Sequence, residues 1–276
     1  MQISHKPPFS YLYTPLVQRS GATADMLMDF GVLKLKGGTQ WEHESKTDEQ
    51  CWLLSQGSAR ITWLVFMGGD GPQYAEISRP NLFDHSPFCL SVPNRTRIVI
   101  DAGEEGAEFY FCATENSKRF KARLFKPEEC MSEFRGAGTM RETSTRIVRT
   151  CFDDTNHSES NLVIGEVIGV PGKWSSYPPH HHPQPEIYHY RFLPEQGFGL
   201  TVIGDKPYLL KDKDTILIKE GDVHPQVTAP GYAMWYLWVI RHLEGAHYGP
   251  CTNTPIFVEE HKWVMGDESK IWQPKS

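Results

Sequence analysis

The 276-residue chain lacks the features that mark membrane-spanning, disulfide-rich and nucleic-acid-binding proteins. No uninterrupted apolar run approaches the roughly eighteen residues of a membrane helix, and the first eight residues, MQISHKPP, hold no signal-like apolar segment. The six cysteines are scattered without a Cys-x-x-Cys pair, which argues against a disulfide scaffold or a zinc ribbon. The 28 basic and 34 acidic residues give a net charge of −6 without a basic stretch. We therefore expect a cytoplasmic protein with reduced thiols and no nucleic-acid or membrane partner.

Long amphipathic helical periodicity is also scarce. Short segments rich in β-branched and aromatic residues recur instead, separated by Gly, Pro, Asn and Asp. This pattern predicts an all-β sandwich or barrel architecture. The expected strands cover residues 29–35, 51–54, 59–66, 88–92, 97–100 and 108–113 in the first half, and 161–168, 186–192, 208–210, 215–218 and 233–240 in the second.

A polar, charged segment from about residue 118 to 150 separates the two β-rich halves. We expect an N-terminal barrel over residues 1–117, a connector over 118–150 and a C-terminal barrel over 151–276, whose last part packs as a strand or arm. The first half contains a weak repeat of a histidine–carboxylate metal motif around Trp41 and His43, but no second histidine that would converge with His43. We therefore expect the first barrel to carry no metal site.

The most informative motif is His180-His181-His182-Pro-Gln-Pro-Glu186, followed at a distance by His224. On a strand, residues i and i+2 point to the same face, so His180 and His182 converge while His181 points away. Glu186 would open the next strand after the Pro-Gln-Pro turn, and His224 could complete the set from across a barrel. Three imidazoles and one carboxylate suit zinc, ferrous iron or manganese. The alternative is a surface run of histidines beside a hydrogen-bonded core histidine.

Strand alternation from Glu186 indicates the side chains that share its face. Tyr188 and Tyr190 follow at the next two same-face positions and are candidate catalytic residues, with core packing as the alternative. Glu195, in the turn sequence Pro-Glu-Gln-Gly, is a candidate general base, with a carboxylate that is only hydrated by solvent as the alternative.

Several blocks of sequence together resemble the 5-deoxy-glucuronate isomerase family. They are residues 172–182 (GKWSSYPPHHH), 186–192 (EIYHYRF) and 194–199 (PEQGFG). The resemblance implies two cupin (double-stranded β-helix, jelly-roll) barrels in one chain and a bound divalent metal, zinc in the first place, with manganese or iron as options. It also implies an aldose–ketose isomerase that converts 5-deoxy-glucuronate to 2-deoxy-5-keto-gluconate in inositol catabolism. Carried over residue by residue, the metal ligands are His180, His182, Glu186 and His224.

The sequence also departs from this family. Only three residues separate His182 from Glu186, and Thr201-Val202 stands where the family tends to have Gln-Arg. An isomerase of a different sugar acid, a cupin dioxygenase using ferrous iron and a non-catalytic sugar-binding cupin therefore stay open. The expected partner is a small-molecule sugar acid, and a homo-oligomer is a further expectation. The cation that binds the substrate carboxylate could be any of Arg191, Lys219 and Arg241.

Overall fold

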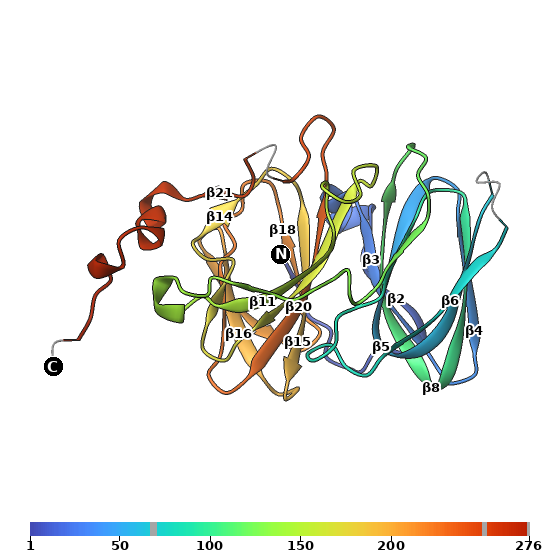
Figure 1. Ribbon diagram of the computed structural model, residues 1–276, viewed down its shortest axis with the longest axis horizontal. Coiled ribbons are helices and arrows are strands. Elements are labelled where there is room, and N and C mark those ends of the chain that lie inside the picture. The colour runs from blue at the N-terminus through green and yellow to red at the C-terminus, as the bar shows by residue number, and fades with distance from the viewer. Residues whose placement is uncertain (67–70, 250–252, 275–276) are drawn as a thin grey trace.

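The chain folds into two β barrels that lie side by side, the first half of the sequence forming one and the second half the other (Figure 1). The computed structural model describes residues 1–66, 71–249 and 253–274. The predicted all-β architecture, with two jelly-roll barrels in one chain, is confirmed. None of the described helices is long and apolar enough to cross a membrane.

The first barrel is built around two long strands, β5 (Asp48–Val65) and β8 (Thr96–Glu115), which pair with each other along most of their length. Each covers two segments predicted as separate strands, because a register shift near Gly57 bends the pair without ending it. At this bend a Cβ on Gly57 would lie 2.2 Å from the Gly106 carbonyl oxygen, so only glycine fits. The other elements are β2 (Leu12–Val17), the 3₁₀ helix Gly21–Met26, β3 (Asp29–Leu35), β4 (Gln40–Ser45), β6 (Gln73–Arg79), β7 (Cys89–Val92) and β9 (Arg123–Phe125).

The second barrel packs a seven-stranded sheet, in the order β1-β18-β15-β20-β12-β11-β10, over a four-stranded sheet, β13-β19-β16-β17. A two-stranded ribbon of β14 and β21 adjoins it. Its elements are β1 (Gln2–Ile3), β10 (Glu133–Arg135), the 3₁₀ helix Met140–Glu142, β11 (Arg146–Phe152), β12 (Leu162–Gly169), β13 (Trp174–Ser175), β14 (His180–His181), β15 (Glu186–Leu193), β16 (Phe198–Ile203), β17 (Lys206–Lys211), β18 (Thr215–Ile218), β19 (Gln226–Thr228), β20 (Ala233–Arg241) and β21 (Ile256–Phe257).

Segments far apart in the sequence join the two barrels. The N-terminal strand β1 pairs with β18 of the second barrel. Residues 118–150 add a strand to each barrel, because β9 pairs with β7 of the first and β10 pairs with β11 of the second. At the C-terminus, β21 pairs with β14. The 3₁₀ helices Glu259–Met265 and Glu268–Lys270 then extend away from the barrels (Figure 1).

Strand alternation divides the interior into three hydrophobic clusters, one inside each barrel and one between them. On β15, Ile187 belongs to the cluster between the barrels, whereas Tyr188 and Tyr190 belong to the cluster inside the second barrel. A buried ion pair also crosses the junction: Arg79 of β6 bonds Glu166 of β12 at 2.6 Å, and both side chains are fully buried. The face of β15 opposite Glu186 therefore contacts the first barrel of the same chain.

Candidate metal centre

Three of the four predicted metal ligands converge at one end of the second barrel. The ligand atoms of His182, Glu186 and His224 all lie within 4.8 Å of one another. A Glu186 oxygen, Oε2, is 3.1 Å from Nε2 of His182 and 3.4 Å from Nε2 of His224. His180 adjoins this group, with its ring centroid 4.7 Å from that of His224. The structure thus brings three of the predicted ligands together and places His180 beside them.

Backbone carbonyls orient all three imidazoles in the same way. Nδ1 lies 3.2 Å from the Pro178 carbonyl oxygen in His180, 2.9 Å from that of Gln184 in His182, and 2.8 Å from that of Asp222 in His224. A carbonyl oxygen can only accept, so each Nδ1 carries the proton and each Nε2 presents a lone pair. In His224 that Nε2 is buried and has no hydrogen-bond partner among the described residues.

The arrangement of these imidazoles around Glu186 suits a bound cation. Without one, the Nε2 lone pairs of His182 and His224 would face the same Glu186 oxygen, Oε2, which is also an acceptor. Burial lowers the pKa of His180 well below its ordinary value, and the nearby His224 lowers it further. Burial also lowers the pKa of His224. The two imidazoles therefore stay neutral, which is the form that binds a metal.

The local sequence explains how the ligands meet. β14 ends at His181, and the Pro-Gln-Pro turn leads into β15, whose first residue is Glu186. On the other side, β18 pairs with β15 and ends at Ile218. The turn that follows contains Gly221, at a φ of +76°, whose N–H donates to the His182 carbonyl oxygen over 3.1 Å. This turn carries His224 back toward Glu186.

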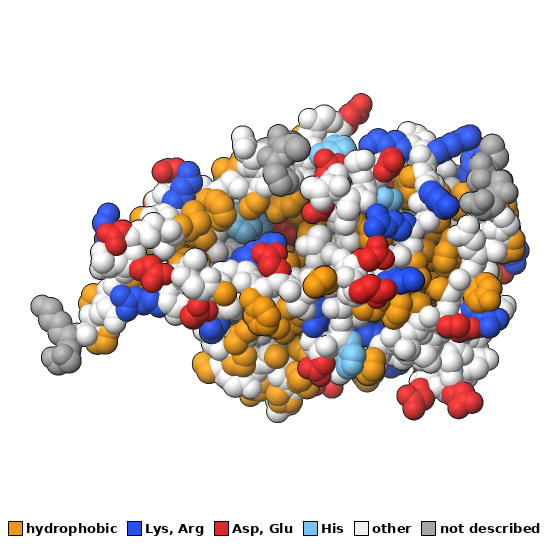
Figure 2. Space-filling view, in the orientation of Figure 1, with side chains coloured by type: hydrophobic (Ala, Val, Ile, Leu, Met, Phe, Trp, Pro, Cys, Tyr) orange, Lys and Arg blue, Asp and Glu red, His pale blue; other side chains and the backbone are white. Residues whose placement is uncertain are grey.

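A cavity of about 420 Å³ opens beside the cluster. His180, Glu186 and Tyr188 line one part of it. Figure 2 shows histidine atoms in a hollow of this face, with hydrophobic and charged side chains around it. The remaining lining residues are Arg135, Gly136, Thr139, Met140, Arg146, Val148, Val167, Ser175, Ser176, Tyr177, Pro178, Tyr236, Trp238, Tyr248, Pro255, Phe257 and Met265.

The predicted catalytic residues lie at different positions relative to the cavity. Tyr188 lines the cavity, and its Oη lies 3.2 Å from Oγ of Ser176. Tyr190 shares its face but lies outside the lining, where its hydroxyl donates to Gln226 over 2.7 Å. The prediction for Glu195 needs correction: its side chain is 72 % exposed, pairs with Lys213 at 2.6 Å and is absent from the cavity lining. Glu195 follows the end of β15, whereas Glu186 begins it, so the strand length separates the two carboxylates.

None of the three cations expected for a substrate carboxylate lines the cavity. Arg191 pairs with Glu108 and Asp212 at the junction of the barrels, and Lys219 pairs with Asp25. Arg241 donates to Thr114 and to the carbonyl of His242. Two other arginines, both in the segment expected to be a connector, line the cavity instead: Arg135 and Arg146.

Sequence reasoning also missed side chains that the C-terminal region adds. The ring of Tyr248 lies 5.1 Å from that of His182, and the ring of Phe257 lies 5.7 Å from that of His180, both between centroids. Phe257 reaches the site because β21 pairs with β14. No local pattern in the sequence signals this pairing.

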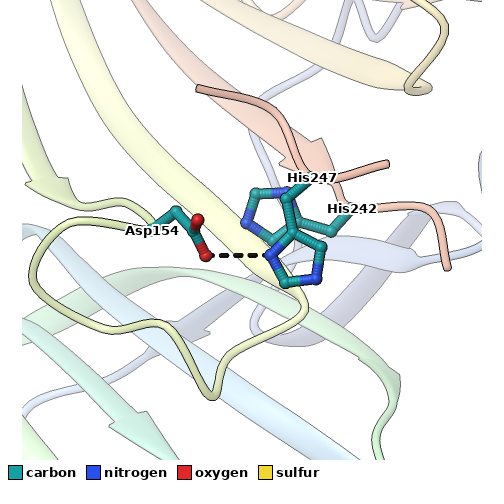
Figure 3. A group of neighbouring side chains, drawn as sticks. All are labelled: Asp154, His242 and His247. Atoms are coloured by element: carbon teal, nitrogen blue, oxygen red, sulfur yellow. Dashed lines mark hydrogen bonds and ion pairs between the residues drawn. The ribbon is translucent and has the colours of Figure 1, made fainter. Parts of the chain in front are cut away.

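A second group of potential ligands, Asp154, His242 and His247, also lies within 4.8 Å (Figure 3). Its geometry does not suit a metal. The two imidazole rings are stacked 4.3 Å apart at 9°, so their in-plane lone pairs run parallel and do not converge. Nδ1 of His242 accepts the N–H of Tyr248 over 2.9 Å, which leaves the ring proton on Nε2. This group therefore fixes the loop that holds Tyr248 beside the cavity.

Two jelly-roll barrels, one of which encloses a buried histidine–glutamate cluster, define the chain as a cupin protein with two barrels. Solved structures agree with this fold: an oxalate decarboxylase from Lactobacillus farciminis superposes with a TM-score of 0.62 at 12 % identity, covering 85 % of this chain and 82 % of that one. An IolB-like protein from Salmonella typhimurium LT2 has a TM-score of 0.75 at 24 % identity, covering 92 % and 99 %. A sequence model of the KduI/IolB family matches residues 10–264, so the chain belongs to that family.

Curated relatives share most of their length with this chain. The 5-deoxy-glucuronate isomerase of Geobacillus kaustophilus (strain HTA426) is 29 % identical over 260 residues, covering 88 % of this chain and 86 % of the relative. The enzyme of the same name from Bacillus subtilis (strain 168) is 24 % identical over 255 residues, covering 86 % and 88 %. The family resemblance is confirmed, as is the enzyme class, an isomerase of the intramolecular oxidoreductase type.

Proposed function

We propose that the protein is a metal-dependent aldose–ketose isomerase that converts the acidic sugar 5-deoxy-glucuronate to 2-deoxy-5-keto-gluconate. The observation that carries this proposal is the convergence of His182, Glu186 and His224, with His180 beside them, at the edge of a cavity. The names of the curated relatives support the choice of substrate.

The donor set suits a divalent metal of the zinc, manganese or iron group. His180, His182 and His224 would supply neutral nitrogen ligands, and Glu186 a carboxylate oxygen. When bound, such a metal holds the carbonyl and the neighbouring hydroxyl of an open-chain sugar and polarises them as a Lewis acid. The backbone carbonyls that hold each Nδ1–H keep the imidazoles in the orientation this requires.

We assign Tyr188 as the catalytic side chain that hydrogen-bonds the sugar oxygens. Burial raises the pKa of Tyr188 well above its ordinary value, and the charge of Glu186 raises it further, so the phenol keeps its proton and donates it in a hydrogen bond. Ser176 lies within hydrogen-bond distance of the Tyr188 hydroxyl and orients it. Tyr190 packs behind Tyr188, with ring centroids 6.3 Å apart, and acts as a positioning residue. Tyr188 can give its proton to the oxygen on carbon one and take the proton of the oxygen on carbon two, while the hydrogen on carbon two moves to carbon one.

The test is NMR of the purified protein with 5-deoxy-glucuronate under nitrogen, with and without a chelator. We expect conversion to the keto acid that the chelator abolishes and added metal restores. His181→Ala is the matched control for His182→Ala, because the two residues are neighbours but only His182 belongs to the cluster.

The rival functions give different results in the same experiment. A ferrous dioxygenase would leave the sugar unchanged under nitrogen and consume oxygen in air. A sugar-binding cupin would show line broadening of the sugar without conversion. Absence of conversion by metal-loaded protein, followed by turnover of another uronate, would reassign the substrate and keep the reaction class.

A further inference from the structure

Arg146 is a cation that lines the cavity without a carboxylate partner. It is half-buried, and its guanidinium donates to the Ser144 carbonyl oxygen over 2.9 Å and lies 3.4 Å from the Ser144 hydroxyl. No Asp or Glu oxygen of the described residues lies within 4.0 Å of it. Burial lowers the pKa of Arg146, and the charge of Arg135 opposes its ionisation as well. A positive charge withdrawn from water in this way is costly unless an anion compensates it.

Most other arginines with little exposed surface bond a carboxylate. Arg241 has none among the described residues, but it donates to Thr114 and to the His242 carbonyl and lies outside this cavity. Arg79 and Arg149 both bond Glu166. Arg191 bonds Glu108 and Asp212. In each case the fold supplies the counter-charge from a neighbouring strand. No carboxylate of the described residues pairs with Arg146, which Glu133 affects only from beyond 4.0 Å, and Arg146 lines the cavity.

A second observation concerns strand register. Arg135 of β10 and Arg146 of β11 are direct partners across the antiparallel pair, so two like charges stand opposite each other. Such pairs destabilise a sheet. Glu133 compensates the charge of Arg135, which it bonds at 2.9 Å. That ion pair is largely exposed, because the side chain of Arg135 is 48 % exposed and that of Glu133 is 60 % exposed. Both arginines line the cavity that contains His180, Glu186 and Tyr188.

We propose that Arg146, assisted by Arg135, binds the carboxylate of the substrate and makes the enzyme selective for acidic over neutral sugars. This assignment rests on the proposed isomerase function. An open-chain sugar acid has its carbonyl at one end and its carboxylate at the other. The histidine cluster would take the first end and the arginine pair the second, and Tyr188 and Tyr236 line the same cavity. A carboxylate between two guanidinium groups satisfies both and removes their repulsion.

The test compares two substrates that differ only at carbon six, 5-deoxy-glucuronate and its neutral counterpart 5-deoxy-glucose. We expect Arg146→Gln to lower kcat/KM for the acid by about 10- to 100-fold, the loss of a hydrogen bond to a charged group, mainly through KM. Turnover of the neutral sugar and bound metal should stay within about twofold of wild type. Arg146→Lys should restore part of the selectivity, because it keeps the charge but not the planar fork.

The matched control is Arg60→Gln, which removes an exposed arginine from the first barrel, where it pairs with Glu76. It should leave both substrates unaffected. A second readout is the melting temperature without ligand. Arg146→Gln should melt at the same temperature as wild type or higher, because it removes a like-charge pair. A lower melting temperature with unchanged selectivity would assign Arg146 a structural role and overturn the proposal.

Calorimetry with D-gluconate separates this inference from the isomerase proposal. If the wild type isomerises 5-deoxy-glucuronate but Arg146→Gln keeps full selectivity for the acid, the carboxylate site is refuted and the isomerase stands. If no sugar is isomerised but gluconate binds in an Arg146-dependent way, the isomerase is refuted and the anion site stands. If gluconate does not bind and nothing is isomerised, both are refuted.

Discussion

The two barrels share one kind of fold but differ in what their interiors contain. Inside the first barrel, His43 is stacked on Trp41, with centroids 5.5 Å apart at 6°, and meets Trp52 and Phe111 edge-on. Trp52 and Phe111 in turn contact each other at 4.4 Å. Inside the second barrel, the corresponding interior holds tyrosines, buried histidines and Glu186 around a cavity.

The difference shows how a barrel gains or loses a site. Large aromatic side chains fill the first interior and stabilise it by burying apolar surface. The second interior keeps polar groups and open space, which stabilise the fold less but can hold a ligand. His43 illustrates this contrast, because the burial that lowers its pKa comes from aromatic rings and no second histidine faces it among the described residues.

The largest effect that we expect is a difference in metal binding between variants of the two barrels. His182→Ala and Glu186→Gln should lose bound metal and lower isomerase activity on the order of 10³-fold, since each removes a ligand. His43→Ala in the first barrel should keep both. Elemental analysis and the NMR assay measure the two quantities. Equal metal content in all three variants would place the metal elsewhere.

The next effect tests the junction between the barrels. Arg79→Met should cost about 3–5 kcal/mol of unfolding free energy, because it removes an ion-pair partner of Glu166 and also leaves the Leu54 and His85 carbonyl oxygens without the hydrogen bonds that Arg79 donates. Arg60→Met removes a partner from an exposed ion pair and should cost at most about 1 kcal/mol. Urea denaturation provides both values. Similar costs for the two variants would show that the buried pair does not hold the barrels together.

A third effect concerns pH and the loop beside the second barrel. Burial, with the neighbouring His247, lowers the pKa of His242 from 6.5 to about 4. Its contribution to stability is therefore present above pH 6.5 and is lost as the pH falls toward 4, a loss on the order of 3 kcal/mol. His242→Asn keeps an acceptor for the Tyr248 N–H but does not titrate, so its stability should fall less over this range. Urea denaturation at several pH values measures the difference, and His261→Asn, on the exposed C-terminal segment, should follow wild type.

The smallest effect compares one aromatic side chain from each interior. Phe111→Leu in the first barrel should cost about 1–2 kcal/mol of stability and leave kcat within about twofold, because it only loosens packing. Tyr188→Phe in the second should change stability by less than about 1.5 kcal/mol and lower kcat by about 10- to 100-fold, because it removes only a hydroxyl. The two variants would refute the comparison if their effects on kcat were equal.

Local patterns determined much of the fold. The enrichment of short segments in β-branched and aromatic residues predicted strands at residues 29–35 and 215–218 with the bounds that β3 and β18 have. It divided β5 and β8 into separate strands, because the bend at Gly57 interrupts the pattern but not the pairing. The histidine spacing predicted a local cluster, since the period of two along a strand depends only on neighbouring residues.

Tertiary structure decided what surrounds that cluster. Arg135, Arg146 and Phe257 reach the cavity only because β10 pairs with β11 and β21 pairs with β14, and no residue pattern within those segments specifies the partner. Glu195, close to Glu186 in sequence, lies away from the cavity because an extended strand separates residues along its length. The sequence alone thus determined some of the strands, β3 and β18 among them, and the histidine–glutamate motif, because these depend on short-range patterns. The fold alone decided the cations and the cavity walls, because they come from strands that meet only through long-range pairing.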